Sequence, residues 1–105
     1  MITIDDFKKL DIRIGKVIAA EKVTEKLIKF IFDLGSEKRQ IMAGMGEFFE
    51  DVSLLLGKEM PLLVNIQPAI FRGHRSEGMI LAADLQGKPI LLHPEQDIPP
   101  GTKIR

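Results

Sequence analysis

The chain has 105 residues, no cysteine, and 15 Lys+Arg against 15 Asp+Glu, which gives a formal net charge of +0 at pH 7. This length suits one domain with one modest hydrophobic core, and the missing cysteines exclude disulfides, a thiol nucleophile and Cys-containing zinc sites. No apolar run approaches the roughly 20 residues of a membrane span. The acidic start also lacks the apolar region of a signal peptide, so we expect a cytoplasmic protein without membrane contact.

The N-terminus predicts a short helix. Thr3 and Asp6 have the spacing of a capping box, in which each side chain accepts a hydrogen bond from the other residue's backbone. We therefore expect a helix over residues 4–9, with Phe7 and Leu10 facing the core.

Three antiparallel strands are predicted next. Residues 11–21 alternate between apolar and polar side chains, which indicates a half-buried strand with the inward positions Ile12, Ile14, Val17 and Ala19. Gly15 interrupts the alternation, and a glycine inside a strand often marks a bulge or bend of the kind that closes small barrels. Residues 27–34 and 39–43 supply the second and third strands of a meander. One face of the second strand carries Ile28, Phe30, Phe32 and Leu34.

After the third predicted strand, the spacing of the apolar residues changes from that of a strand to that of a helix. Phe48, Val52 and Leu55 lie at i, i+4 and i+7, and Gly57 comes directly after this run. This spacing and the terminal glycine predict a short helix within residues 47–57.

Further strands are predicted in the second half of the chain. Apolar runs at residues 60–66 and 79–83 have the length and composition of strands. Residues 89–93 give an extra strand, and a Pro-Pro-Gly turn leads into a last short segment at residues 102–105.

The order of three strands, a helix and two strands, with a bend in the first strand, predicts an all-β OB-fold, a five-stranded and partly open barrel. An SH3-like barrel is the alternative, and the intervening helix favours the OB-fold. We expect a single domain over residues 1–105, with the barrel in about residues 1–85 and a C-terminal extension over residues 86–105. The fold alone does not settle the function.

The loop between the two apolar runs carries the features expected of a binding site. It holds Arg72, His74 and Arg75 beside flexible glycines, between two rigid strands. Functional residues concentrate in such loops, so we expect this loop to grip an RNA backbone. Because the whole chain is electrically neutral, the positive charge must be concentrated locally, and binding should weaken as salt rises.

Motifs for catalysis or metal binding are incomplete. The run GHRSEG places Gly73 three residues before Ser76, and a strand follows, so it does not match the strand-to-helix nucleophile elbow. His74 and His93 are the only histidines and lack the paired spacing of a zinc site. We therefore expect no catalysis, no cofactor and no metal.

Aromatic residues indicate core rather than base contacts. Stacking on nucleobases is one role open to Phe30 and Phe32, but their apolar neighbours on the same face indicate a buried position. The chain has no Tyr and no Trp. We therefore expect recognition to depend on charge and backbone shape more than on base stacking.

Seven segments form an ordered set of motifs: residues 6–7, 11–17, 25–30, 39–45, 56–58, 65–68 and the signature SEGMILAA at 76–83. In this order they resemble the tRNA-binding domain family. The family's OB-fold module occurs at the C-termini of methionyl-tRNA synthetases, in the precursor of endothelial monocyte-activating polypeptide, and as free-standing dimers.

The resemblance implies a non-catalytic module that binds tRNA by its shape, free-standing or as a partner of a methionyl-tRNA synthetase. It places RNA contacts on Arg13, Lys16, Arg39, Asn65, Ser76 and Met79, in addition to the basic residues of the loop. Amide and hydroxyl groups such as those of Asn65 and Ser76 can hydrogen-bond phosphate or sugar. Arg13 and Arg39 have an alternative role as solvated strand-edge charges, and Met79 as a flexible packing residue. The C-terminal extension is expected to help form a homodimer.

The chain departs from its relatives in two places. The loop between the first two strands is shortened to Val23 and Thr24, and Gln67, Ala69 and Ile70 stand where relatives carry basic residues. These departures keep a second hypothesis open: a dimerisation, assembly or chaperone-like module with weak or no tRNA binding.

Overall fold

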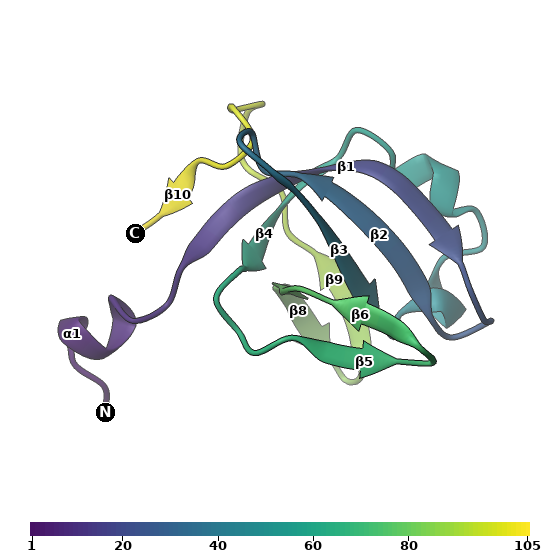
Figure 1. The fold of residues 1–105 in the computed structure, drawn as a ribbon, viewed down its shortest axis with the longest axis horizontal. Helices are drawn as coiled ribbons and strands as arrows, with labels where there is room; N and C mark the ends of the chain where they lie inside the picture. Colours follow the sequence, from purple (N-terminus) through teal and green to yellow (C-terminus); the bar gives the residue numbers. More distant parts are fainter.

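The computed structural model describes residues 1–105, and its centre is an antiparallel sheet rolled into a barrel (Figure 1). The strands of this sheet follow the spatial order β3-β2-β1-β4-β7. Their bounds are Ile12–Lys22 for β1, Ile28–Asp33 for β2, Lys38–Ala43 for β3, Glu59–Leu63 for β4 and Met79–Ile80 for β7. The all-β, five-stranded OB-type barrel predicted from the sequence is confirmed.

The barrel closes between β3 and the residues that precede β7. The backbone N–H of Glu77 donates to the carbonyl of Gln40 at 2.8 Å. Two residues farther along β3, the N–H of Met42 donates to the hydroxyl of Ser76 at 3.0 Å. One backbone bond therefore joins the two edges, and the other hydrogen bonds between them involve side chains, which leaves the barrel only partly closed.

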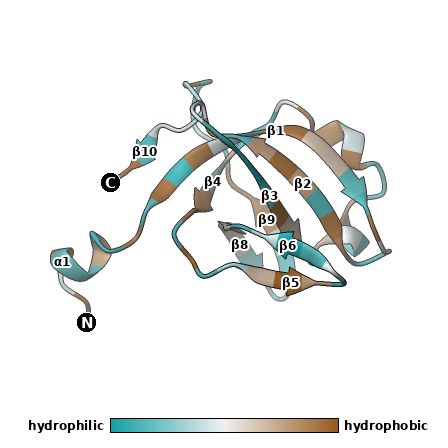
Figure 2. Ribbon diagram, in the orientation of Figure 1, coloured by the Kyte–Doolittle hydropathy of each residue, from teal (hydrophilic) through white to brown (hydrophobic).

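The core follows the alternation of β2. Ile28, Phe30 and Phe32 are fully buried, and the two phenylalanine rings stack with their centroids 5.5 Å apart. Figure 2 shows the corresponding alternation of hydrophobic and hydrophilic residues along β1 and β2. The prediction that both rings belong to the core is confirmed.

The bulge in β1 is at Ile18, whereas the sequence placed it at Gly15. The pairing of β1 with β2 shifts between Val17 and Ala19. The extra residue reverses the alternation, so Ala20 packs against the core and Ala19 is exposed, contrary to the prediction. Gly15 has a different role: a Cβ there would collide with Cδ1 of Leu62, so the glycine allows β1 to lie close to β4.

The N-terminal helix α1 is shorter than predicted, Ile4–Phe7. The predicted capping box is present, with Thr3 N donating to Asp6 at 3.0 Å and Asp6 N donating to Thr3 at 3.2 Å. The helix extends away from the barrel (Figure 1), so Leu10 is exposed and Phe7 only half-buried, and the prediction that both face the core was wrong.

Two 3₁₀ helices replace the single predicted helix. They are η1, Gly46–Phe48, and η2, Val52–Leu55. The side chain of Asp51 accepts from the N–H of Ser53 at 3.0 Å, so it caps a new turn rather than continuing the first one. Leu55 is buried as expected, but Phe48 is 45% exposed.

The C-terminal third leaves the barrel and returns to it. The predicted strand at residues 79–83 is split at Leu81 into β7 and β8, Ala82–Leu85, and β8 forms a hairpin with β9, Lys88–Leu91. The last strand, β10, Lys103–Ile104, then pairs with the start of β1. None of the helices has the length and apolarity required to cross a membrane.

Candidate nucleic-acid interface

The predicted basic loop contains a two-stranded hairpin. Its strands are β5, Ala69–Phe71, and β6, His74–Ser76, joined by Arg72 and Gly73. Both turn residues have positive φ, 51° and 81°, which is the conformation of a type I′ turn. Arg72 is exposed at the tip and has no carboxylate within 4.0 Å of its guanidinium.

Ser76 fixes the base of the hairpin to β3. Its side chain is buried, and its hydroxyl accepts from Met42 N and donates to the carbonyl of Gly78 at 3.2 Å. Beside it, Gln40 donates from its side chain to the carbonyl of Arg75 at 3.0 Å. The hydroxyl predicted to contact RNA therefore has two partners inside the protein.

Asn65 connects β4 to the N-terminal segment. Its side-chain oxygen accepts from the N–H of Asp11 at 2.9 Å, and its amide group donates to the carbonyl of Lys9 at 2.7 Å. These bonds orient the segment that enters β1 and leave the amide with limited capacity for an external ligand.

Arg39 lies on β3, where this strand meets the residues that precede β7. Its guanidinium donates to the carbonyls of Val64 and Glu77 and forms an ion pair with Glu37 at 3.0 Å. The side chain is only 25% exposed. Arg39 therefore bridges β3 to the two segments that flank the hairpin.

Arg13 forms two hydrogen bonds with Asp11, at 2.9 and 3.2 Å. These bonds lower the pKa of the Asp11 carboxyl, and Arg39 and Lys103 lower it further through their charges. The carboxylate in turn raises the pKa of Arg13. Arg13 and Arg39 are thus each paired with an acid, Asp11 and Glu37.

The remaining predicted residues are more accessible. Lys16 is exposed on β1, two strands away from the edge on which the hairpin rests. Arg75 lies on β6 with its guanidinium 3.8 Å from Glu77, and His74 opposes Phe71 across the hairpin. Met79 is 42% exposed and pairs with Leu63 of β4.

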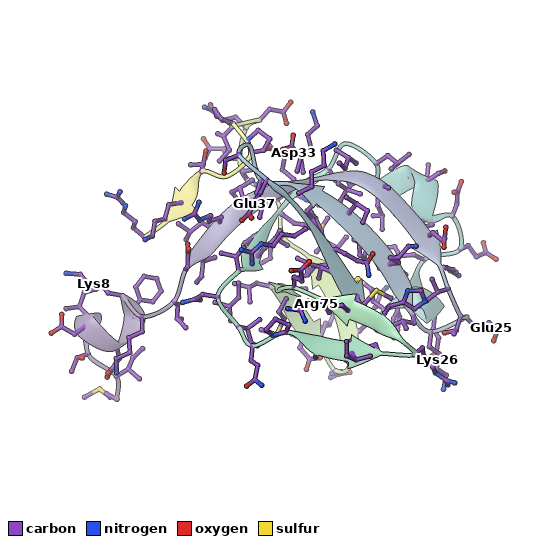
Figure 3. The ribbon with its side chains drawn as sticks, viewed as in Figure 1. Lys8, Glu25, Lys26, Asp33, Glu37 and Arg75 are labelled. Atoms are coloured by element: carbon purple, nitrogen blue, oxygen red, sulfur yellow. The ribbon has the colours of Figure 1, made fainter.

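A shallow depression of about 360 Å³ lies between the β1–β2 turn, residues 23–27, and the tip of the β5–β6 hairpin. We call it the hairpin depression; its lining includes Lys26, Leu27, Gly44, Ile70, Phe71 and Arg72. Oligonucleotides bind OB-folds at the loops between strands 1 and 2 and between strands 4 and 5, and these are the two loops that meet here. Figure 3 shows Lys26 of the turn close to the end of the hairpin.

Lys26 and Phe71 were missed in the sequence. Lys26 has no carboxylate within 4.0 Å, and its signals in the sequence were its place between the first two strands and within the matching run 25–30. Phe71 follows the apolar residue Ile70 in the sequence. Such an apolar pair is typical of core residues, so Phe71 was not predicted as a contact. No group of three or more His, Asp or Glu residues is arranged to hold a metal ion.

Residues 12–103 match the model of a family described as a putative tRNA binding domain. The chain is 51% identical over 105 residues to the methionine–tRNA ligase of Archaeoglobus fulgidus, covering 98% of this chain and 16% of that protein. The ligase of Thermotoga maritima is 47% identical over 105 residues, with the same coverage. The chain therefore spans only a small part of the length of these relatives.

Two solved structures are similar over the whole chain. A MetRS-related protein from Pyrococcus horikoshii has a TM-score of 0.93 and 34% identity, with 100% of this chain and 98% of that one covered. The chaperone CsaA from Bacillus anthracis has a TM-score of 0.90 and 32% identity, with 100% and 99% covered. By its sequence match over residues 12–103, the chain belongs to the putative tRNA binding domain family.

Proposed function

We propose that this chain is a non-catalytic tRNA-binding module that uses the face formed by the β1–β2 turn and the β5–β6 hairpin. The observation that carries the proposal is the meeting of these two loops, each of which presents a cation without an acidic partner, Lys26 and Arg72. Family membership and the similarity to methionine–tRNA ligases support tRNA as the nucleic acid.

The nine predicted residues divide into two roles in this proposal. Arg72, His74 and Arg75 of the hairpin contact the RNA backbone, with Met79 at the margin of the surface. Lys16, two strands away on β1, lies outside this surface. The other four, Arg13, Arg39, Asn65 and Ser76, act mainly by holding the hairpin and the neighbouring segments in place, because their polar groups already have partners within the protein.

In this proposal, contacts between cations and phosphates supply only a small part of the affinity for tRNA. Each phosphate neutralised by a cation contributes about −0.7 to −0.9 to the slope of log K against log salt. Three or four available cations therefore correspond to a slope of roughly −2 to −4, well below that of strongly basic nucleic-acid binders. Shape and hydrogen bonding must supply the remainder of the affinity.

A titration of total tRNA at several salt concentrations tests the proposal. The double variant Arg72→Ala with Arg75→Ala should weaken binding of all tRNAs about equally and reduce the salt slope by about 2. Lys88→Ala is the matched control, because Lys88 is an exposed lysine of β9 outside the hairpin depression. Absence of binding by the unmodified chain at low salt would contradict the proposal.

The relation to a synthetase is a further part of the proposal. Because the chain corresponds to 16% of the ligase of Archaeoglobus fulgidus, its own role would be to hold tRNA for a catalytic unit located elsewhere. A pull-down with methionyl-tRNA synthetase, with and without tRNA, distinguishes a direct protein contact from one that tRNA bridges.

A second candidate function is homodimeric assembly. A depression of about 410 Å³ between α1 and β10 is lined by the apolar residues Ile4, Phe7, Leu10 and Ile104 and by the basic residues Lys8, Lys103 and Arg105, and Ile4 is 66% exposed. An apolar surface of this kind commonly marks a protein contact. Sedimentation should show a dimer that Ile4→Glu dissociates, whereas Leu54→Glu, at a 71% exposed position on η2, leaves it intact.

A chaperone-like role is the other form of this second candidate. The similar CsaA from Bacillus anthracis is a chaperone, and an exposed apolar surface could hold an unfolded client in the same way that it holds a second copy. A client-holding assay on Ile4→Glu and Leu54→Glu addresses this alternative: only the first variant should lose the activity.

A further inference from the structure

We infer that the hairpin depression binds one unpaired nucleobase of the RNA, stacked on Phe71, with the flanking phosphates near Lys26 and Arg72. The inference rests on the proposed function and adds a ligand class, single-stranded rather than duplex RNA. It differs from the expectation drawn from the sequence, in which charge and backbone shape dominated.

The exposure of Phe71 is the first observation. All three residues of β5 are exposed, and Phe71 is 45% exposed although the phenylalanines of β2 are fully buried. An exposed aromatic ring next to an arginine gives a base both a stacking surface and a cation.

The composition of the depression is the second observation. Leu27, Ile70 and Phe71 provide apolar surface, Lys26 and Arg72 provide positive charge on the two sides, and no lining residue is acidic. An apolar surface between two cations matches a nucleotide, whose base has apolar faces and whose phosphates are anionic. The volume of about 360 Å³ falls at the lower end of the range for small-molecule sites, which suits a single nucleotide.

The rigidity of both walls is the third observation. The hydroxyl of Thr24 accepts from the N–H groups of Lys26 and Leu27 at 3.2 and 3.0 Å, and the carbonyl of Lys26 accepts from Gly46 N at 2.9 Å. A Cβ on Gly46 would lie 2.5 Å from the carbonyl oxygen of Glu25, so the turn packs tightly against η1. On the other side, Ser76 holds the hairpin. Binding therefore needs little ordering of the protein, which lowers its entropic cost.

Paired RNA does not fit this arrangement. In an A-form duplex the bases are stacked within the helix and their faces are inaccessible, whereas loops and ends present unstacked bases to aromatic side chains. The depression should therefore prefer the unpaired loops and the single-stranded end of a folded RNA over its stems.

The test compares two phenylalanines that are equally exposed. Phe71→Leu removes the π-face but keeps an apolar side chain, and Phe48→Leu is the control, because Phe48 is also 45% exposed but does not line the depression. The probe is a single-stranded oligoribonucleotide that contains 2-aminopurine, whose fluorescence falls when the base stacks. Phe71→Leu should reduce the quenching and weaken binding about fivefold or more, with the salt slope unchanged.

A second variant tests the same site without altering Phe71. Gly44 lines the depression, its φ is not positive, and a Cβ there would meet no atom within 4 Å. Gly44→Leu should fill the space and cause the same loss of quenching in a folded protein, and circular dichroism verifies the fold.

The outcomes separate the inference from the proposed function. If the unmodified chain binds tRNA but Phe71→Leu and Gly44→Leu behave like Phe48→Leu, base stacking is wrong and tRNA binding stands. If the unmodified chain binds neither tRNA nor the probe at low salt, both are wrong. Equal affinity of the unmodified chain for a fully paired RNA of the same length also overturns the inference.

Discussion

Arg13, which the resemblance places among the RNA contacts, forms an ion pair with Asp11 that stabilises the fold. The two side chains share two hydrogen bonds, while the backbone N–H of Asp11 donates to Asn65 and its carbonyl accepts from Val64 N at 2.9 Å. Asp11 therefore links the entry of β1 to the end of β4. Its carboxylate also cancels the charge of the arginine that the resemblance assigned to RNA.

This pair predicts a specific pH dependence. The pKa of Asp11 is lowered in the folded state, mainly by the hydrogen bond from Arg13. A lowered folded-state pKa gives stability that is present above the unfolded-state pKa of about 3.9 and lost as pH falls through the folded-state value. Arg13→Ala should return the pKa of Asp11 toward its ordinary value, as followed by NMR of the carboxyl carbon. The variant should be less stable at neutral pH and equal to the unmodified protein in strong acid.

At the scale of the element, the β5–β6 hairpin is a rigid unit seated on β3. Its turn needs two positive φ angles, which only Gly73 adopts without strain. Its base depends on the buried hydroxyl of Ser76. The base of the hairpin and the closure of the barrel therefore depend on the same hydrogen bonds between β3 and residues 75–77.

Ser76→Ala should therefore destabilise the protein by about 1–3 kcal/mol, because the buried N–H of Met42 loses its acceptor. Ser53→Ala is the matched control: its hydroxyl bonds to Asp51 at an exposed site, so the change should stay within about 0.5 kcal/mol. Urea unfolding measures both. Similar stabilities of the two variants would show that the hydroxyl of Ser76 does not hold the closure.

The sequence predicted those features of the fold that depend on residues close together in the chain. The alternation over residues 28–34 placed the four inward residues of β2 and its end correctly, and the Thr3–Asp6 spacing predicted the capping box, because both signals act over a few residues. The bulge at Ile18 could not be read, because it depends on how β1 pairs with β2. The same limit applies to the site: Lys26 and Phe71 are 45 residues apart in sequence, and only the folded chain brings them to one depression.

At the scale of the whole molecule, the C-terminal segment completes the first strand. The N–H of Ile14 donates to the carbonyl of Thr102 at 2.9 Å, and the N–H of Gly101 donates to the carbonyl of Ile14 at 2.7 Å. A Cβ on Gly101 would collide with the carbonyl of Leu34, so the segment also fits closely against the turn after β2. Farther back, the buried side chain of Glu59 accepts from the N–H of Ile98 at 2.9 Å.

Deletion of residues 102–105 should consequently destabilise the barrel by about 1–3 kcal/mol, since it removes β10 and leaves the N–H of Ile14 without its acceptor. Hydrogen exchange at the Ile14 amide should accelerate. Deletion of Arg105 alone, beyond the last pairing, is the control and should change neither quantity. If the longer deletion leaves exchange at Ile14 unchanged, the C-terminal strand is not part of the stable fold.

The longest dimension of the molecule is 39 Å, and the two chain ends emerge together at one extremity of it while the hairpin tip and the β1–β2 turn lie toward the other (Figure 1). A polypeptide joined to either end would thus be attached far from the proposed RNA-binding face. Linking two modules raises the local concentration of a molecule bound to one module near the other module. A domain whose termini and binding face lie at opposite ends can keep a large RNA beside a protein fused to it, even when the RNA dissociates quickly.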